Sequence, residues 1–346
     1  MSWIRFEARL MDAIPYQHYG GISKNWNDGT IYCSLPTANL VHQQLRVEKK
    51  FLHPIPLNTP TTIMSKGKSI IVTLFDANHC PGAVMFLFDI GNKKVLHVGD
   101  FRFNRQLMMQ VPQLLAFSNG RSRLDEIFLD TTYCDAKYTL PTQEEAISAA
   151  IEVAGKEMQT SNKDMTMKTL FLFGSYTIGK EKIYMSVAEY LKKKVFVDSR
   201  RYQIISSFEW PKERMELFTT NKSDTNLWVV PLGSVNFKQM PDYLEEANKN
   251  KALFAAPYGR VVGFRPTGEL NKTIISHRLL LLQSSFPNPT TTMPSISGWT
   301  YKAQAKRQTT LVPSTSAKNL ITSKTNGRYS IHGAPYSEHS SFPVSE

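Results

Sequence analysis

Cysteine is scarce in this chain, and its three cysteines, Cys33, Cys80 and Cys134, lie far apart and form no CxxC pair. This spacing argues against a disulfide scaffold and against a zinc site built from thiolates, and it indicates a reducing compartment. No apolar run approaches the length of a membrane span, so the chain is not expected to be embedded in a membrane. The first residues, MSWIRFEARLMD, include acidic side chains and no long apolar core, which argues against a secretory signal.

Basic side chains, in contrast, are abundant. The 346 residues contain 41 Lys and Arg against 29 Asp and Glu, a net charge of +12. Such an excess attracts polyanions, so nucleic acid is the first expectation for a partner and an anionic membrane surface the second. The length fits one large domain or two of ordinary size, and the 41% of hydrophobic residues is enough for a real core.

Three short apolar runs, at residues 70–75, 83–90 and 94–98, are separated by Gly, Pro, Asn and Asp. This pattern predicts three strands joined by turns. His79 and Asp100 stand where the first and the third strand end, and loops at strand ends are common places for ligands and catalytic groups. The alternative is that each is an ordinary turn residue.

A second polar group follows the predicted strand 127–129, in the run Asp-Thr-Thr-Tyr-Cys that begins at Asp130. The next segment, 142–155, has the composition of a helix. Thr142 is its predicted N-cap, and Glu145, three residues on, is its capping-box partner.

The predicted strand 169–173 runs into the loop GSYTIGK, and a helix is predicted over 181–194. A strand, a glycine loop and a helix can bind phosphate, because free N–H groups and the positive helix end face the anion. A nucleotide-hydrolysing P-loop would need Ser or Thr at the position of Glu181. A phosphate cradle without nucleotide hydrolysis and a merely structural turn remain as alternatives.

Strands and helices alternate along the rest of the chain, which predicts an α/β fold. Further strands are predicted at 30–34, 194–197, 227–232, 252–255 and 261–266, and further helices at 37–47 and 107–117. The stretch 269–297 is rich in Thr, Ser, Pro and Asn and reads as an inserted loop. The basic stretch 302–324 reads as an exposed segment, with a nuclear import signal as the alternative.

Several motifs occur in a familiar order: YGGISKNW, DANHCPGAVMFLF, VGDFRF, LDTTYC, FGSYTIGKEK, FRPTG, GW and PYSEHSS. In this order they resemble the metallo-β-lactamase nucleases of the β-CASP group, and most closely the DNA cross-link repair branch that includes Artemis and Apollo. The resemblance covers roughly residues 19–341, apart from the insert.

The resemblance implies an αβ/βα metallo-β-lactamase sandwich with an inserted β-CASP α/β domain. Residues 1–130 would form the metallo-β-lactamase part, residues 131–330 the β-CASP domain with the inserted loop, and residues 331–346 a return to the first part. The sandwich is expected to be incomplete at both ends. The implied activity is metal-assisted hydrolysis of DNA from 5′ ends, with two zinc ions, in the nucleus.

The resemblance also implies roles for single residues. The metal ligands would be His18, His79, Asp100 and His339, and the catalytic residues Asp100, Asp130 and His339. The residues near the terminal phosphate of DNA would be Thr132, Ser175, Tyr176 and Lys180.

The sequence departs from the family pattern in one motif. The HxHxDH motif would end at His18, but its other ligand positions hold Ala13, Pro15 and Gln17. We therefore expect at most one weakly bound zinc and an impaired nuclease, because two ligands seldom hold a zinc ion.

Three hypotheses follow. The first is a zinc-dependent 5′-to-3′ exonuclease that acts on 5′-phosphorylated DNA ends in interstrand cross-link repair. The second is a catalytically silent protein that binds DNA ends or repair proteins through its basic β-CASP half. The third is a gene product without a stable function.

Overall fold

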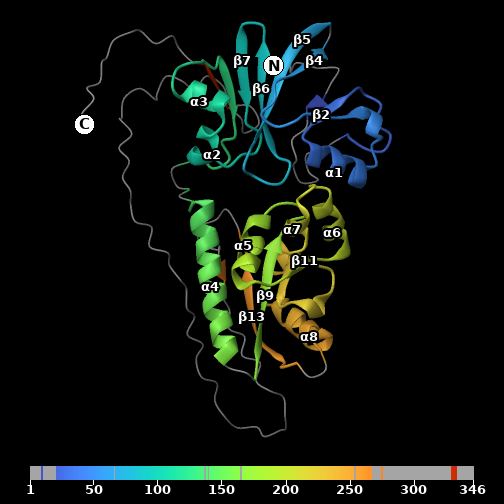
Figure 1. The fold of residues 1–346 in the computed structure, drawn as a ribbon, viewed down its shortest axis with the longest axis vertical. Helices are drawn as coiled ribbons and strands as arrows, with labels where there is room; N and C mark the ends of the chain where they lie inside the picture. The colour runs from blue at the N-terminus through green and yellow to red at the C-terminus, as the bar shows by residue number, and fades with distance from the viewer. Residues whose placement is uncertain are drawn as a thin grey trace, which may run out of the picture.

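The protein is described by a computed structural model, which covers residues 9–10, 21–65, 67–135, 138, 140–163, 166–252, 255–266, 274–275 and 329–332. Two α/β halves follow one another along the chain, as the upper and lower parts of the ribbon in Figure 1 show.

The first half is built on a six-stranded sheet that contains the three predicted strands. Its strand order is β15 (Tyr329–His332), β8 (Glu126–Leu129), β7 (Lys93–His97), β6 (Val84–Ile90), β5 (Lys68–Asp76) and β4 (Thr61–Ser65). Strands β4 to β7 are antiparallel neighbours, β7 and β8 are parallel, and β15 is antiparallel to β8. Because β6 and β7 are joined by a tight turn at Gly91, with φ +66°, their register is fixed locally.

A small parallel sheet lies beside it, formed by β1 (Arg9–Leu10), β2 (Ile31–Cys33) and β3 (Leu52–Pro54). The following helix, α1 (Leu35–Leu45), begins at Ser34, whose side chain accepts a hydrogen bond from the N–H of Thr37. It ends at Arg46, which adopts the left-handed conformation. The hydroxyls of Ser34 and Thr37 also donate to the carbonyl of Gly82, at 2.8 and 3.1 Å, and so tie this helix to the loop after β5.

The predicted helix at 107–117 is wrong in one respect, because the structure has two short helices there, α2 (Arg105–Met109) and α3 (Pro112–Ser118). Pro112 is the reason for the break. A proline has no N–H to continue a helix and disfavours the helical conformation at the residue before it. Val111 is accordingly extended, and α3 starts at the proline.

The second half has a six-stranded sheet covered by helices. Its strand order is β11 (Phe218–Thr219), β10 (Val195–Phe196), β12 (Leu227–Pro231), β9 (Lys168–Ser175), β13 (Tyr258–Phe264) and β14 (Ile274–Ile275). All pairs are parallel except β13 with β14. The helices are α4 (Gln143–Lys163), α5 (Glu181–Leu191), α6 (Ser199–Ser206), α7 (Lys212–Met215) and α8 (Met240–Asn250), with single 3₁₀ turns at η3 (Lys222–Asp224) and η4 (Leu232–Ser234). A further 3₁₀ turn, Lys49–Phe51, precedes β3 in the first half.

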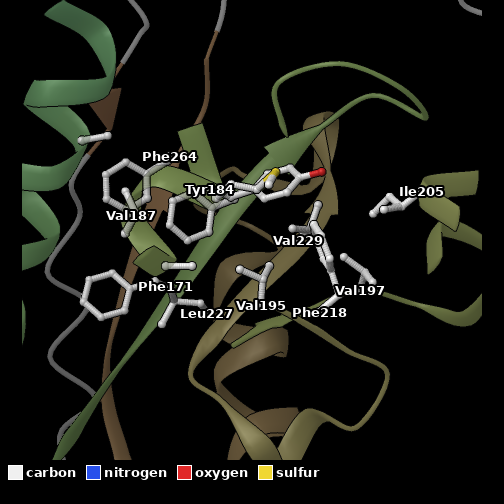
Figure 2. Packing of buried hydrophobic residues seen from close by; sticks show 14 of the residues in the cluster. Phe171, Tyr184, Val187, Val195, Val197, Ile205, Phe218, Leu227, Val229 and Phe264 are labelled. Atoms are coloured by element: carbon white, nitrogen blue, oxygen red, sulfur yellow. The ribbon is translucent and has the colours of Figure 1, made fainter. Parts of the chain in front are cut away.

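The core of this half lies between the sheet and helices α4 and α5, and Figure 2 shows part of it. Phe171 and Phe173 point to the same face of β9 because strand side chains at i and i+2 share a face. The rings of Phe173 and Phe264 stack with centroids 4.7 Å apart, and the buried ring of Tyr184 on α5 packs edge-on against Phe173. These aromatic contacts hold β9 and α5 together, and the loop between them is the one that contains Lys180.

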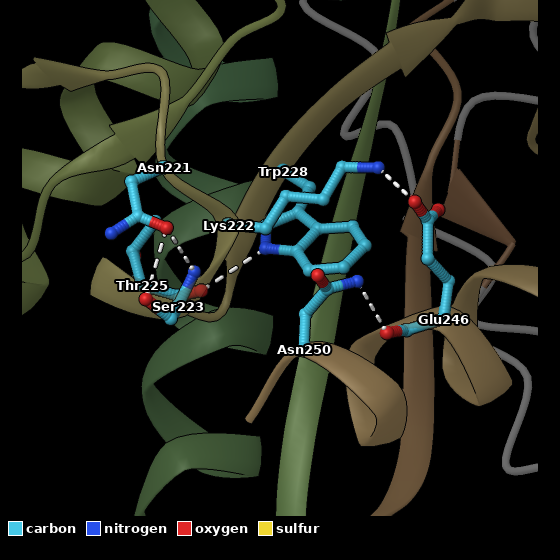
Figure 3. A network of polar contacts seen from close by, with 7 residues as sticks. All are labelled: Asn221, Lys222, Ser223, Thr225, Trp228, Glu246 and Asn250. Atoms are coloured by element: carbon cyan, nitrogen blue, oxygen red, sulfur yellow. Dashed lines mark hydrogen bonds and ion pairs between the residues drawn. The ribbon is translucent and has the colours of Figure 1, made fainter. Parts of the chain in front are cut away.

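On the other face of the same sheet, next to the start of β12, η3 is held by a polar network (Figure 3). Lys222 makes an ion pair with Glu246 of α8, and its ammonium lies 5.0 Å from the centroid of the Trp228 ring and 5.2 Å from that of Phe196. The indole N–H of Trp228 donates to the carbonyl of Thr225 at 3.0 Å. This network is structural and lies away from the loops at the carboxyl ends of the strands.

The strand predicted at 252–255 is wrong. Ala252 and Ala255 lie outside any strand, and the N–H of Ala255 donates to the carbonyl of Ala252 in a turn. Alanine is a poor strand former, so the apolar composition was misleading. Helices α6 and α8 were not predicted. No helix in the described part of the chain has the length and apolar character to cross a bilayer.

Candidate functional site

The loop between β5 and β6, residues 77–83, presents His79. The carbonyl of Ala77 accepts a hydrogen bond from the N–H of Arg102 at 2.9 Å, and the N–H of Ala77 donates to the carbonyl of Ala83. Asn78 is in the left-handed conformation, with φ +55°, and its N–H donates to the carboxylate of Asp76 at 2.5 Å. The backbone around His79 is therefore fixed on both sides.

Asp100 follows β7, and a sharp turn places it beside this loop. Gly99 has a φ of +58°, and its N–H donates to Nδ1 of His97 at 3.2 Å. Two residues further on, the N–H of Arg102 donates to Ala77, so the segment that contains Asp100 is hydrogen-bonded to the segment that contains His79.

Asp130 follows β8, a third strand of the same sheet. Its carboxylate accepts hydrogen bonds from the N–H and the hydroxyl of Thr132, at 2.9 and 2.6 Å. Thr132 was predicted to lie near a DNA phosphate. In the structure its hydroxyl supports Asp130, and the two residues form one turn.

The loop between β9 and α5 contains the other three predicted phosphate-binding residues. Ser175 is buried, and its hydroxyl lies within 2.8 Å of the carbonyl of Gly179 and 3.0 Å of that of Tyr176. It also lies 3.2 Å from the guanidinium of Arg201, which donates to the Tyr176 carbonyl at 2.6 Å. Ser175 therefore shapes the loop from inside, whereas Tyr176 has 52% of its surface exposed.

Two N–H groups at the end of this loop, those of Gly179 and Glu181, are not free to hold a phosphate in the manner of a P-loop. The buried carboxylate of Glu181 accepts a hydrogen bond from the N–H of Gly179 at 2.6 Å and one from its own N–H. Burial raises the pKa of Glu181, and these N–H groups and Arg201 act against that rise. The carboxylate of Glu181 thus occupies the place that a phosphate takes in a P-loop.

Lys180 is the cation that this loop presents. It caps α5 in the left-handed conformation, with φ +71°, and its ammonium lies 6.0 Å from the centre of the Tyr176 ring. Its pKa is lowered by burial first and by the charge of Arg102 second, while Glu181 and Cys80 act in the opposite direction. Two cations therefore face one another here, an arrangement that a bound anion would stabilise.

The predicted site residues of the two halves converge on His79. Burial is the largest cause that lowers its pKa, and the charges of Lys180 and Arg102 add to this effect. The charges of Asp100 and Asp130 act in the opposite direction. His79 is thus neutral near pH 7, the form that binds metals. Side chains that follow two other strands of the first half, β7 and β8, and one side chain from a loop of the second half influence a single imidazole.

Two further predicted ligands, His18 and His339, lie outside the described residues, as do Ala13, Pro15 and Gln17. Within the described ranges no three His, Cys, Asp or Glu side chains come close enough together to hold a metal ion. The imidazole of His79 and the carboxylate of Asp100 are ordinary zinc ligands, so this pair fits part of a metal site.

Three residues with contacts in this region were missed from the sequence: Asn78, Arg102 and Lys182. Arg102 influences both His79 and Lys180. Its place in VGDFRF, two residues after Asp100, was the available signal, because a basic side chain next to a ligand is suited to a phosphate substrate. Lys182 carried no signal of its own, since its contact with Asn78 joins residues 104 positions apart.

Comparison with known proteins agrees with this arrangement. The profile of the DNA repair metallo-β-lactamase family matches residues 212–274 and 269–343. The DNA cross-link repair protein SNM1 of Arabidopsis thaliana is 33% identical over 326 residues, which are 94% of this chain and 54% of that protein. The chain is thus similar to the DNA repair metallo-β-lactamase family and to its DNA cross-link repair proteins.

Other members of the family are similar over much of the chain. The human DNA cross-link repair 1A protein is 32% identical over 94% of this chain and 25% of its own length. The 5′ exonuclease Apollo of Gallus gallus is 30% identical over 64% of this chain and 43% of its own length. The chain thus spans about half the length of the Arabidopsis relative and a quarter of the human one.

These similarities confirm the predicted α/β fold class and the predicted resemblance. Similarity to a metallo-β-lactamase family also implies binding of a metal ion. The described residues that would take part are His79 and Asp100, at the ends of β5 and β7.

Proposed function

We propose that this protein is a DNA repair nuclease that hydrolyses phosphodiesters from 5′ ends, in the nucleus, during interstrand cross-link repair. The observation that supports this proposal most is that the segments of His79 and Asp100 are hydrogen-bonded to one another through Arg102 and Ala77, while the charges of Arg102 and Lys180 also act on His79. An imidazole and a carboxylate suited to a metal, near two cations suited to a phosphate, fit hydrolysis of a phosphate ester.

The roles of the single residues follow from their chemistry. His79 and Asp100 would hold zinc, together with His18 and His339, and a bound metal would supply an activated water near neutral pH. Asp130 would accept a proton or support the ligands, with Thr132 holding its carboxylate in place. Lys180 and Tyr176 would contact the terminal phosphate of the DNA, while Ser175 shapes the loop around them.

The domain boundaries are part of the proposal. Residues 1–130 and 331–346 would form the metallo-β-lactamase part, and residues 131–330 the β-CASP domain. The pairing of β15 with β8 supports a return of the chain to the first sheet near residue 329. The profile match over residues 212–343 agrees with a second domain in this region.

A second function is favoured by one specific observation. Because Ala13, Pro15 and Gln17 occupy the HxHxDH positions, at most one zinc would bind, and weakly. The protein would then bind 5′-phosphorylated DNA ends, or repair proteins, without cutting. Its net charge of +12 supports binding of DNA in either case.

One experiment separates the two functions. The full chain is incubated with 5′-phosphorylated single-stranded DNA and added zinc or magnesium, beside the variants His79→Ala and Asp100→Ala. Digestion that both variants lose supports the nuclease, and retention of DNA without digestion supports the binding protein. Digestion that both variants retain would show that the cut does not occur at this site. Metal analysis complements the assay, because two tightly bound zinc ions per chain would contradict the impaired metal site.

A further inference from the structure

The two halves of the protein meet at Asn78, the residue before His79. Only 8% of its surface is exposed, although it lies in a loop. Its side-chain amide donates to the carbonyl of Arg102 at 3.3 Å, and its N–H donates to Asp76. A left-handed residue with a polar side chain bound on several sides is held in one conformation.

Two residues of the second half complete this contact. The side-chain amide of Gln143, the first residue of α4, donates to the carbonyl of Asn78 at 3.0 Å. The ammonium of Lys182 on α5 donates to the side-chain oxygen of Asn78, and it also donates to the side-chain oxygen of Gln143 at 3.2 Å. We call Asn78, Arg102, Gln143 and Lys182 the Asn78 cluster.

The cluster connects the two loops that carry the proposed site. Asn78 directly precedes His79, and Lys182 follows Lys180 by two residues on the first turn of α5. The loops also touch one another, because a side-chain carbon placed on Gly179 would lie 3.7 Å from that of Cys80. Any displacement of α5 relative to β5 would therefore strain the cluster first.

We propose that the Asn78 cluster positions Lys180 relative to His79 and Asp100, and that the preference for a 5′-phosphorylated end, which belongs to the proposed function, is maintained by this contact between the two halves. This inference rests on the proposed function. A terminal phosphate bound at Lys180 is productive only if the next phosphodiester reaches His79 and Asp100 at the same time. A shift of about 1 Å in such a geometry can cost a factor of a hundred in rate. The members of the cluster are positioning residues, since none of them needs to touch the reacting atoms.

The structure offers a matched control, because the halves also meet between α1 and α6, through residues other than those of the Asn78 cluster. There the side chain of Gln43 on α1 donates to the carbonyl of Gln203 at 3.3 Å and accepts from the hydroxyl of Ser207 at 2.6 Å. Gln43 and Gln143 are both half-buried glutamines that bridge the two halves. Gln143→Leu and Gln43→Leu are thus the same substitution without a change of charge, and each removes two hydrogen bonds at a contact between the halves; Gln43→Leu also removes one with Gln44.

Two measurements on the full chain test the inference. The first compares the affinity for a 5′-phosphorylated oligonucleotide with that for its 5′-hydroxyl counterpart, in the presence of a chelator so that nothing is cut. The wild type and Gln43→Leu are expected to prefer the phosphorylated strand, and Gln143→Leu is expected to lose at least threefold of that preference. The second measures hydrogen exchange of the backbone in residues 76–83 and 175–182 without DNA. Both segments are expected to exchange faster in Gln143→Leu and to remain unchanged in Gln43→Leu.

An unchanged preference and unchanged exchange in Gln143→Leu would overturn the inference. So would equal effects of the two variants, because they would indicate a general loosening of the halves. If the wild type itself had no preference for the 5′-phosphate, the proposed function would fail at Lys180. The exchange measurement would then still decide whether the cluster couples the two loops. Asn78→Gly, which tolerates the left-handed backbone, provides a second variant with the same expected result.

Discussion

Gly263 on β13 offers a sharp test of how the second half is packed. A side-chain carbon at this position would lie 2.5 Å from Cγ1 of the buried Val235 and 3.1 Å from the sulfur of Met240. Methionine can move aside because it is flexible. Valine cannot, because its β-branched side chain has few rotamers. The substitution Gly263→Ala therefore forces Val235, and with it the turn after η4, away from the sheet.

The expected cost follows from these distances. Overpacking of a dense core costs about 1–3 kcal/mol. Replacing glycine by alanine in a strand returns about 0.5–1 kcal/mol, because the unfolded chain loses freedom. We expect a net loss of about 1–2 kcal/mol in the free energy of unfolding of Gly263→Ala. If the free energy of unfolding falls by about 2 kcal/mol per molar urea, the urea concentration at the midpoint of unfolding should fall by about 0.5–1 M.

A double-mutant cycle identifies the cause. Val235→Ala alone should cost about 2 kcal/mol, because it removes buried methyl groups. If the clash with Val235 causes the destabilisation of Gly263→Ala, the double variant should be about 1 kcal/mol more stable than the sum of the two single losses predicts. Gly233→Ala is the control, since nothing lies within 4 Å of the added carbon. Strictly additive effects, or equal effects of Gly263→Ala and Gly233→Ala, would refute the reasoning.

Three further predictions concern other parts of the molecule. Burial raises the pKa of the Cys33 thiol from 9.0 to about 12, so the folded state keeps its proton when the unfolded state has lost it. Stability should therefore fall by about 1.4 kcal/mol between pH 8 and pH 10 in the wild type under reducing conditions, and this part of the slope should vanish in Cys33→Ala. Lys222→Met removes a half-exposed ion pair and two cation–π contacts. Thermal unfolding should show a decrease of about 1 kcal/mol in the free energy of unfolding. A variant as stable as the wild type would show that the network in Figure 3 contributes no net stability. Thr142→Ala removes the N-cap of α4 and should cost about 1 kcal/mol by urea denaturation, whereas an unchanged midpoint would mean that packing alone holds the first turn.

Local sequence patterns determined much of the fold. The predicted strands at 70–75, 83–90 and 94–98 are confirmed by β5, β6 and β7. The prediction succeeded because the pattern of apolar residues, the turn residues and the strand propensities all indicate strands there. The capping box of α4 is also confirmed, since the side chain of Glu145 accepts from the N–H of Thr142 and the hydroxyl of Thr142 accepts from the N–H of Glu145. Such features depend on neighbours within a few residues, which a sequence displays directly.

The order of motifs in the sequence was enough to identify the family, but the use of each side chain depended on tertiary structure. Ser175 and Thr132 carry hydroxyls suited to a phosphate, yet the fold engages both within their own loops. The carboxylate of Glu181 accepts from the N–H of Gly179, only two residues away, but the fold alone buries this carboxylate and brings Arg201 to Ser175. The contact between Asn78 and Lys182 was equally hidden. Hydrogen bonds between segments far apart in the chain require the packed sheets and helices, and no local pattern encodes them.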